Sequence, residues 1–480
     1  MNPPPAATLD APPDLTVRLA RFAADVHASD LAPETLDKTR MAILDAVGCG
    51  VAGCRDPAVE ILVQTAAADG DGGRCPILGR PETFTPRAAA LITGTMIHVL
   101  EMDDTHSFSS VHAGGPVVAA SLAAFRQQAA DDDTVLAAVA AGYEIACRLG
   151  TAIRGPSPYH RGFHPTGICG VFGAATACGK LFGLDSDGFR RAWGIAGSMA
   201  GGLMAYLQNG AWTKKLHPGW AAQAGLTAAR LAAGGFLGPD DIFGGQYNFC
   251  RAYADAFDGA ALGEQLGTRF EIGRMSYKPF ACCRTIHAPI TAALALRRRP
   301  GFDARRIERI YAHIADEDLD LVVEPLERKR QPRTLVEAQF SMPFGVALAL
   351  TAGAAGPAQY TRRHLDDPLI RALAQRFEYR LEDDYTRRRP LYFPCRLDVE
   401  MAGRVVGTAV DAPLGDFTNP MSNEQMIAKF RALAGPVLGH DRAQELERTV
   451  LDLGRKKSRP GFGRLAGLAV GPGKVDTSAA

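Results

Sequence analysis

Hydrophobic residues in the first half of the chain recur with the spacing of buried helices. Apolar and small residues follow one another at intervals of three and four positions, and Gly, Pro or Asp separates the segments. The strongest helical pattern covers the ranges 34–53, 87–100, 134–150, 167–183 and 220–233. Small residues dominate these segments, so their backbones can approach one another closely. The pattern predicts a densely packed, all-helical unit.

After about residue 273 the hydrophobic pattern changes to an alternation with a period of two. In the segment 307–315, the apolar residues Ile310, Ala312 and Ile314 occupy every second position, which is typical of a half-buried strand. The segment 396–410 repeats the alternation around a Gly-containing turn and predicts a β-hairpin. Between them, the ranges 340–352 and 367–377 are typical of helices. This part of the chain therefore predicts an α+β unit.

The last part of the chain returns to a helical pattern. Ser422 is expected to cap its first helix, because Gln425 follows at the spacing of a capping box. A chain of 480 residues exceeds the size at which one hydrophobic core keeps growing. We expect a mainly α protein in which 1–273 and 416–480 form one large helical domain and 274–415 forms a smaller, inserted α+β domain.

Charge and cysteine usage narrow the class of protein. The 53 Lys and Arg residues nearly balance the 52 Asp and Glu residues, so no global field attracts nucleic acid or an anionic membrane. The apolar stretches fall short of the roughly 20 residues that a membrane span needs. The 10 cysteines lack the dense spacing of a disulfide scaffold, and the start of the chain lacks the pattern of a signal peptide. We expect a cytoplasmic protein that binds neither nucleic acid nor a membrane.

The densest group of polar residues lies between two predicted buried helices, in the segment 101–116. It contains three carboxylates, two histidines and several hydroxyl groups. Polar loops between buried elements often carry function, but Asp, Ser and Thr also cap helices routinely. Metal binding is a third interpretation, although no fixed metal-binding spacing occurs here. The pattern alone leaves these alternatives open.

Three further segments place basic residues beside predicted helices. His164 directly precedes the Gly-rich helix, whose N-terminus favours a carboxylate, although a single His beside Pro is more often structural. Lys214, Lys215 and His217 form a cationic group before the range 220–233, where a solvated charge pair is the alternative. Lys278 lies where the helical pattern gives way to strands, and such junctions are preferred ligand clefts.

Several cofactor signatures fail on inspection. The adjacent Cys282 and Cys283 have no C-x-x-C partner, so an iron–sulfur cluster has little support. Gly179-Lys180 is followed by Leu181 and not by the Ser or Thr of a phosphate-binding loop, and no G-x-S-x-G motif occurs. We therefore expect no metal, nucleotide or organic cofactor.

Taken in order, these segments resemble the MmgE/PrpD family, which includes 2-methylcitrate dehydratase, cis-aconitate decarboxylase and iminodisuccinate epimerase. The motifs that carry the resemblance are Leu44-Asp-Ala-Val-Gly-Cys-Gly-Val-Ala-Gly, Asp103-Asp-Thr-His, Gly162-Phe-His-Pro-Thr-Gly, Lys214-Lys-Leu-His-Pro-Gly-Trp, Lys278-Pro-Phe-Ala-Cys-Cys-Arg, Phe340-Ser-Met-Pro-Phe and Asn419-Pro-Met-Ser. The resemblance implies a homodimer, a helical domain built from both chain ends, an α+β lid inserted between them, and no cofactor.

The resemblance also implies the residues of the pocket. Its catalytic positions fall on Glu101, Thr105, His112, His164 and Lys214, and its substrate-binding positions fall on Asp104, Lys278, Cys283 and Met342. Three of these depart from patterns of the family. Glu101 stands where Asp is more common, Cys283 stands where the decarboxylase has His, and Met342 stands where the decarboxylase resembles a Tyr-bearing motif. These departures put cis-aconitate decarboxylation in doubt more than they affect family membership.

The chemistry expected from this set is that of a lyase acting on a small di- or tricarboxylic acid. A 2-methylcitrate dehydratase-like reaction is the first expectation, with a His as acid or base and the lysines binding carboxylates. The same residues would serve a cis-aconitate decarboxylase-like enzyme or an epimerase, and a non-catalytic binding homologue is a further alternative. The sequence does not decide whether His112 or His164 transfers the proton.

Overall fold

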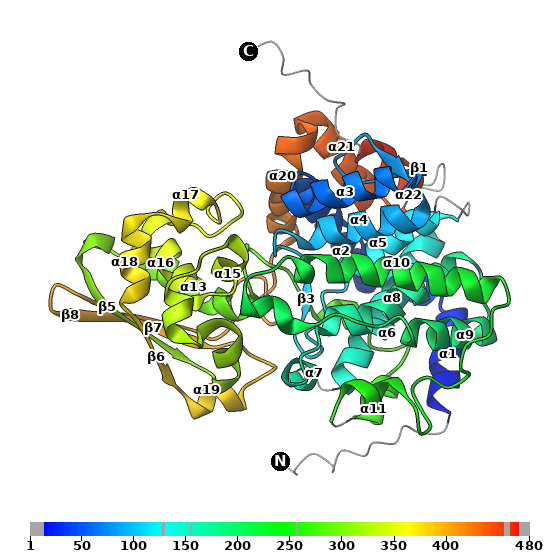
Figure 1. Ribbon diagram of the computed structural model, residues 1–480, viewed down its shortest axis with the longest axis horizontal. Coiled ribbons are helices and arrows are strands. Elements are labelled where there is room, and N and C mark those ends of the chain that lie inside the picture. Colours follow the sequence, from blue (N-terminus) through cyan, green and yellow to red (C-terminus); the bar gives the residue numbers. More distant parts are fainter. Residues whose placement is uncertain (1–13, 126–129, 154–155, 256, 456–460, 470–480) are drawn as a thin grey trace.

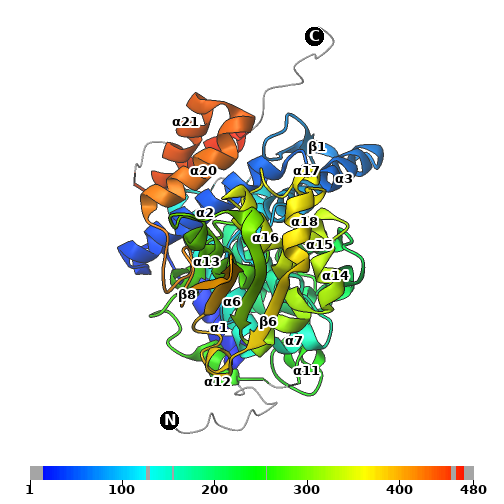
Figure 2. The same ribbon diagram turned by 90° about the vertical axis from the view of Figure 1, so that its left-hand side faces the viewer.

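The computed structural model describes residues 14–125, 130–153, 156–255, 257–455 and 461–469. Within these residues the protein is mainly α-helical. Figure 1 shows a large helical body on the right and a smaller body on the left that contains the four-stranded sheet. Figure 2 looks at the molecule from the side of the smaller body.

The large body is built from long, apolar helices of the first half of the chain. They are α1 (Leu15–Asp25), α2 (Pro33–Gly53), α3 (Pro57–Ala68), α4 (Pro86–His98), α5 (Gly114–Phe125), α6 (Asp132–Ala152), α8 (Pro165–Leu181), α9 (Ser186–Gly197) and α10 (Thr213–Ala233), with the short helices α7 (Pro156–His160), α11 (Phe249–Tyr253) and α12 (Gly259–Gly263). Of the five helices predicted from the pattern, four agree with α2, α4, α6 and α8 to within about two residues at each end. Helix α6 is long and apolar enough to cross a membrane, but 94% of its apolar 18-residue stretch is buried inside the protein.

The fifth prediction was wrong about where its helix begins. We expected a helix over 220–233, because Pro218 and Gly219 interrupt helices. The structure continues α10 back to Thr213, so Lys214 and His217 lie on the helix itself. Tertiary packing overrides the local preference, because Gly219 is the point at which α10 touches α4.

Backbone-to-backbone contact between helices is what brings the polar residues together. A Cβ atom on Gly219 would lie 2.1 Å from the carbonyl oxygen of Leu91 in α4, and one on Gly225 would lie 2.5 Å from Cβ of Ala174 in α8. Side chains of ordinary size would push these helices apart, since protein interiors leave few voids. The close approach holds α10 between α4 and α8, and it places residues near the ends of all three helices side by side.

The smaller body contains a mixed sheet with strand order β6-β5-β7-β8. Its strands are β5 (Ile307–Ile314), β6 (Phe377–Leu381), β7 (Cys395–Met401) and β8 (Arg404–Val410), and its helices are α13 (His287–Arg297), α14 (Leu326–Arg330), α15 (Leu335–Gln339), α16 (Met342–Ala352), α17 (Arg362–Leu365), α18 (Pro368–Gln375) and α19 (Asp383–Arg387). The strand predicted at 307–315 is confirmed as β5, which ends one residue earlier, and the hairpin predicted at 396–410 is confirmed as β7 and β8. Helix α13 packs on β7 and β8, and α18 packs on β5.

Strand β6 was not predicted. The range 367–377 was expected to be one helix, but α18 ends at Gln375 and Phe377 begins a strand that pairs in parallel with β5. Five residues carry too little periodicity to identify a strand by themselves. Pairing with β5, which lies more than 60 residues earlier in the chain, supplies the hydrogen bonds that make this segment a strand.

The last helices return to the large body. They are α20 (Asn423–Leu438), α21 (His440–Leu451) and α22 (Gly461–Leu468), and α20 packs on α2, as Figure 1 shows in orange beside blue. The predicted capping box is confirmed, because Ser422 Oγ accepts from the N–H of Gln425 and the Gln425 side chain accepts from the N–H of Ser422. Lys429 of α20 donates to Asp45 of α2 at 2.6 Å, a buried pair that joins the two ends of the chain.

Candidate active site

The predicted polar segments meet in one buried cluster of ionisable side chains. Its members come from the end of α4, the loop that follows α4, the starts of α8 and α10, and the segment after the short strand β4 (Met275–Ser276). They are His98, Glu101, Asp103, His112, His164, Lys214 and Lys278, and none is more than 8% exposed. Burying so many charges is costly unless each one has a partner. The following contacts show the partner of each charged group.

Glu101 lies between the two buried lysines. Its Oε1 accepts from Nζ of Lys214, and its Oε2 accepts from Nζ of Lys278 at 3.1 Å. Burial by itself would raise the pKa of the Glu101 carboxyl group, but the two ammonium groups outweigh burial and hold this pKa well below its usual value. Glu101 also has a positive φ of 54°, which is uncommon for a residue with a long side chain. The lysines are thus cations held ready for a carboxylate, with Glu101 as their partner inside the protein.

His98 connects Asp103 with Lys214. Its Nδ1 lies 2.7 Å from Asp103 Oδ2 and its Nε2 lies 2.7 Å from Lys214 Nζ. A charged ammonium group only donates, so Nε2 accepts and the ring proton is on Nδ1, which donates to Asp103. Burial would raise the pKa of the Asp103 carboxyl group, but His98, His112 and Lys278 hold it below its usual value.

His112 presents one ring nitrogen for proton transfer. Its Nδ1 lies 2.6 Å from the backbone oxygen of Asp104, so Nδ1 carries the proton and donates it. Its backbone N–H donates to Thr166 Oγ1 at 3.0 Å, which fixes the residue beside the start of α8. Burial, reinforced by the positive charge of Lys278, holds the pKa of this imidazole well below 6.5. At neutral pH the ring is neutral and its Nε2 is the atom that accepts a proton.

His164 occupies the N-cap position of α8 and lies in the same cluster. Its ring centre is 6.0 Å from that of His98 and 6.1 Å from that of His112. Its Nδ1 lies 3.1 Å from Nδ1 of His217, and within the described residues its buried Nε2 has no hydrogen-bond partner. Burial and the charge of Lys214 hold the pKa of this imidazole well below its usual value.

The other predicted site residues occupy two kinds of position. Thr105 lies in the two-residue strand β3 (Thr105–His106), which pairs with β4 just before Lys278. Asp104 faces away from the lysines, since its carboxylate accepts from Tyr143 Oη at 2.7 Å and from the N–H of Gly114 at 3.0 Å. Burial and the nearby charge of Asp103 raise the pKa of the Asp104 carboxyl group to about 7.

Cys283 and Met342 lie on the side of the smaller body. The Cys283 thiol is 3.2 Å from Thr285 Oγ1, and burial raises its pKa. Met342 is fully buried at the first position of α16. Two residues before it, Phe340 places its ring 5.2 Å from Lys214 Nζ. Phe340 therefore borders the cluster at Lys214, and Cys283 lies near enough to Lys278 to affect its pKa.

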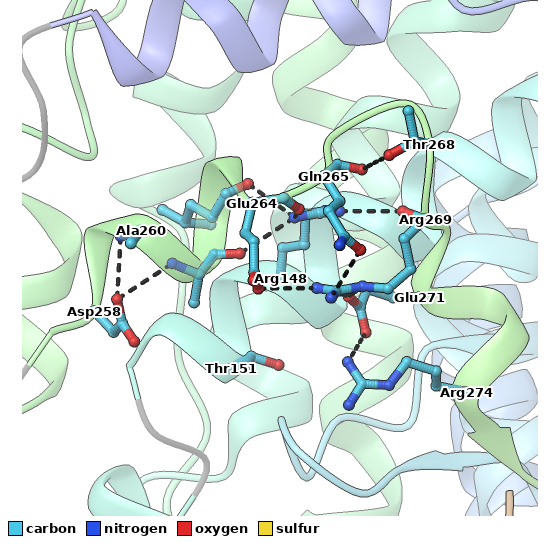
Figure 3. A network of polar contacts seen from close by, with 12 residues as sticks. Arg148, Thr151, Asp258, Ala260, Glu264, Gln265, Thr268, Arg269, Glu271 and Arg274 are labelled. Carbon is cyan, nitrogen blue, oxygen red and sulfur yellow. Dashed lines mark hydrogen bonds and ion pairs between the residues drawn. The ribbon is translucent and has the colours of Figure 1, made fainter. Parts of the chain in front are cut away.

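A buried ion network supports the backbone around β3 and β4. Arg148 of α6 pairs with Glu144 at 2.5 Å. It also donates to the backbone oxygens of Glu264 and Arg269, as Figure 3 shows. Glu144 also accepts from the N–H of Glu271 at 2.6 Å. Glu271 in turn is 3.0 Å from Nε2 of His106. The network therefore anchors the strand pair that carries Thr105 and leads to Lys278.

One trio in the cluster could hold a divalent metal ion by distance alone. Ligand atoms of His98, Asp103 and His112 all lie within 4.8 Å of one another. Asp103 and His98 already bond each other, however, and the ammonium groups of Lys214 and Lys278 repel a second cation at this range. The chemistry of this donor set fits an anionic ligand better than a metal ion.

Sequence reasoning missed three members of the site. His98 lies at the end of a predicted helix, Asp103 was passed over in favour of Asp104, and His217 was seen beside the lysines but given no role. His98 precedes Glu101 by three residues, a spacing that places both at one helix end, and this was the available signal. Which of two adjacent aspartates faces the lysines depends on a loop conformation that no periodicity reports.

The family models match both parts of the chain. The model of the MmgE/PrpD N-terminal domain matches residues 17–260, and that of the MmgE/PrpD C-terminal domain matches residues 280–454. The chain belongs to the MmgE/PrpD family. The histidines of the cluster and Lys214 lie within the first matched region, and Lys278 lies between the two, just before the second one begins.

Curated relatives within the MmgE/PrpD family match nearly the whole chain. A cis-aconitate decarboxylase of Aspergillus terreus is 28% identical over 472 residues, which cover 94% of this chain and 95% of the relative. Cis-aconitate decarboxylases of Homo sapiens and Mus musculus are each 26% identical, over 447 and 441 residues, which cover 90% and 88% of this chain and 91% and 88% of the relatives. This MmgE/PrpD chain is thus similar to these relatives across both bodies.

We predict that Lys214→Met damages turnover and that Lys215→Met does not. Lys214 lies in the cluster, whereas Lys215 pairs with Asp56 at 2.7 Å outside it. Loss of one charge-assisted contact of about 1.5–3 kcal/mol should lower kcat/KM by about 10- to 150-fold. Steady-state kinetics and melting temperatures of both variants check this. A larger kinetic loss for Lys215→Met would contradict the assignment of Lys214 to the site.

Proposed function

We propose that this protein is a lyase of small polycarboxylic acids, and specifically a carboxy-lyase of the cis-aconitate decarboxylase type. The observation that carries the proposal is the pairing of two buried lysines with neutral histidines around one point. Similarity to the cis-aconitate decarboxylases over about nine-tenths of the chain supports the choice of reaction. The 2-methylcitrate dehydratase-like reaction, which we expected first from the sequence, has less support from these relatives.

Decarboxylation of cis-aconitate requires an acid and cationic groups, and the cluster contains both. Loss of CO₂ from cis-aconitate, a propene with three carboxylates, breaks a bond to the allylic carbon and leaves an electron pair spread over the double bond. The reaction then needs a positioned acid that adds a proton to carbon, and cations that stabilise the negative charge. His112 or His164 supplies the proton, and Lys214 and Lys278 bind carboxylates while sharing their charge with Glu101. The imidazole takes up this proton from water when the polyanionic substrate binds, and it is neutral again once the proton has passed to carbon.

Three departures from family patterns bear on the exact substrate. Glu101 is one methylene longer than Asp, which fills space between the lysines, and Cys283 and Met342 lack the ring or hydroxyl groups that the decarboxylase motif has at these positions. These departures alter the fit of a substrate, and the extra methylene of Glu101 by itself moves the carboxylate by roughly one carbon–carbon bond, where catalysis demands close positioning. They leave an epimerase or a dehydratase of a related acid as alternatives, and the assay below distinguishes them. A non-catalytic role fits less well, since burying this many charges is costly without a chemical use.

The α+β body is proposed to act as a lid. A cavity of about 230 Å³ is lined by Tyr206 to Gly210 of the large body and by residues 320–340 of the smaller one. Tyr206 and Phe340 separate it from the cluster, because their rings contact His164 and Lys214 respectively. Movement of the smaller body would open this route to the lysines. A homodimer and a cytoplasmic location remain predictions of the sequence.

We predict that the purified protein converts cis-aconitate to CO₂ and an unsaturated C5 dicarboxylate in equal amounts, with no added cofactor. Released CO₂ and product, followed for cis-aconitate, citrate, 2-methylcitrate and related diacids, check the substrate. Alkene formation from 2-methylcitrate without CO₂ would instead identify a dehydratase. Dialysis against a chelator should leave the rate unchanged, and a rate that vanished and returned with a divalent ion would disprove cofactor independence.

We predict that His112→Gln and His164→Gln lose turnover while staying folded. A positioned acid or base contributes about 10²–10⁴-fold in rate, and Gln keeps polarity and approximate size. His106→Gln is the control, because His106 is equally buried but bonds Ser109 and Glu271 outside the cluster. It should lower the melting temperature more than the turnover of the folded enzyme. Near-normal turnover of both cluster variants would move the acid role to a lysine, Cys283 or Glu101.

We predict that a bound substrate analogue closes the smaller body onto the large one. Hydrogen exchange over residues 278–287 should slow, and the radius of gyration from small-angle scattering should fall. The range 34–53 in α2 serves as a reference for exchange, because it lies in the core of the large body. Identical scattering and exchange with and without the analogue would argue against a lid.

A further inference from the structure

We propose that His217 is the positioning residue for His164: with its own proton on Nε2, it accepts the Nδ1–H of His164 and leaves Nε2 of His164 as the atom that takes up and releases the reacting proton. This inference rests on the proposed function, in which His164 is one of the two candidate acids. It adds a residue to which neither the motif pattern nor the resemblance gave a role.

The backbone holds the two histidine rings close together, with their centres 5.2 Å apart and their planes tilted by 42°. His217 lies on α10 three residues after Lys214, so both side chains project from one face of the helix. Gly202 accepts from the N–H of His164 at 2.9 Å. The same glycine has a φ of 134°, and a Cβ on it would lie 3.2 Å from the ring of His217. A single residue thus fixes the backbone of one histidine and makes room for the ring of the other.

Aromatic packing keeps both rings in place. Tyr206 is 1% exposed. Its ring packs edge-on against His164 at 6.4 Å and against His217 at 6.3 Å. Edge-to-face contacts of this kind favour defined ring orientations. These contacts support the placement of the two Nδ1 atoms 3.1 Å apart.

Only one arrangement of protons lets His164 act repeatedly. Two Nδ1 atoms at hydrogen-bond distance share one proton, because two N–H groups would repel and two lone pairs would also repel. If His217 donated, a protonated His164 would direct a second N–H at it and break the bond. If His164 donates, its Nε2 can gain or lose a proton while the bond between the rings stays intact. His217 then has the role that a carboxylate has beside a catalytic histidine.

The electrostatic environment agrees with this arrangement. Burial, and then the charge of Lys214, lowers the pKa of His217 to about 3, so His217 stays a neutral acceptor at ordinary pH. Nε2 of His164 is fully buried and has no partner within the described chain. An unpaired buried nitrogen is costly, and a substrate atom beside the lysines would supply the missing partner. A neutral acceptor also avoids burying one more negative charge in a site that already has Glu101 and Asp103.

The test compares two replacements at position 217. His217→Asn can return an amide oxygen close to the Nδ1 position, whereas His217→Leu removes the acceptor and fills the space. We expect kcat on cis-aconitate to fall about 10–100-fold for His217→Leu, the range seen when an orienting partner of a functional histidine is lost. His217→Asn should retain part of the kcat that His217→Leu loses, and KM should change little in either variant. His313→Leu is the control, because His313 also bonds two side chains but lies on β5 in the smaller body.

A double variant and a spectrum separate positioning from a structural role. His164→Gln combined with His217→Leu should be no slower than His164→Gln alone, because the two residues act as one unit. Two-bond ¹H–¹⁵N spectra of protein labelled at histidine should show His164 as the Nδ1–H tautomer, and its signals should change in His217→Leu. The His164 signals are assigned by their loss in His164→Gln.

Three results would overturn the proposal. They are wild-type kcat for His217→Leu, fully additive losses in the double variant, and an Nε2–H tautomer for His164 or one that is unchanged in His217→Leu. If His217→Leu does not fold, His217→Gln takes its place in the comparison. The Gln amide falls near the Nε2 position of the original ring, so His217→Gln should restore less of kcat than His217→Asn. The spectrum needs no substrate. If the wild-type protein did not consume cis-aconitate, the proposed reaction would fail while the tautomer would still decide the role of His217.

Discussion

The structure depends on keeping two positive charges, Lys214 and Lys278, out of water. Each of these lysine residues is at most 4% exposed, and removing such a charge from water costs several kcal/mol unless partners replace the solvent. Glu101 supplies the replacement for both lysines, and His98 adds a neutral acceptor for Lys214. A ligand that brings its own carboxylates can take over these contacts. The proposed binding of an anionic substrate therefore depends on this local exchange of partners and needs no net positive charge on the protein.

The same two charges also explain why the histidines are neutral. Burial and the nearby ammonium groups both oppose a second positive charge, so the pKa values of His112 and His164 lie well below 6.5. A substrate with two or three carboxylates would reverse that balance when it enters. Binding of a polyanion therefore raises the pKa of the histidines, and proton uptake by a histidine in turn strengthens binding of the polyanion. A site of this kind delivers a proton mainly when a substrate is present, which suits a reaction that creates a carbanion.

Helix packing provides the precision that this electrostatic arrangement needs. Glycines at the crossings of α4, α8 and α10 bring the three backbones into contact, and the polar residues lie at or near helix ends, where loops can enter the site. The Arg148 network performs a similar task for β3 and β4, whose pairing places Thr105 close to Lys278. Rigid elements thus hold residues that are far apart in the sequence within a few ångströms of one another, as catalysis requires.

The sequence by itself determined the periodic features of this protein. The helical spacing of apolar residues predicted four helices closely, and the alternation of apolar and polar residues predicted β5 and the β7–β8 hairpin. The ordered motifs indicated the family and most of the basic residues of the site. These signals are local, because a helix or a strand leaves its period in adjacent residues. Tertiary structure decided the rest. Strand β6 forms because β5 is available to pair with it, and α10 continues through Pro218 because Gly219 packs against α4. The conformation of one loop decides that Asp103, and not Asp104, faces the lysines. The contacts of His98 with Lys214 and of His164 with His217 join residues more than 50 positions apart. Neither feature produces a periodic pattern in the sequence.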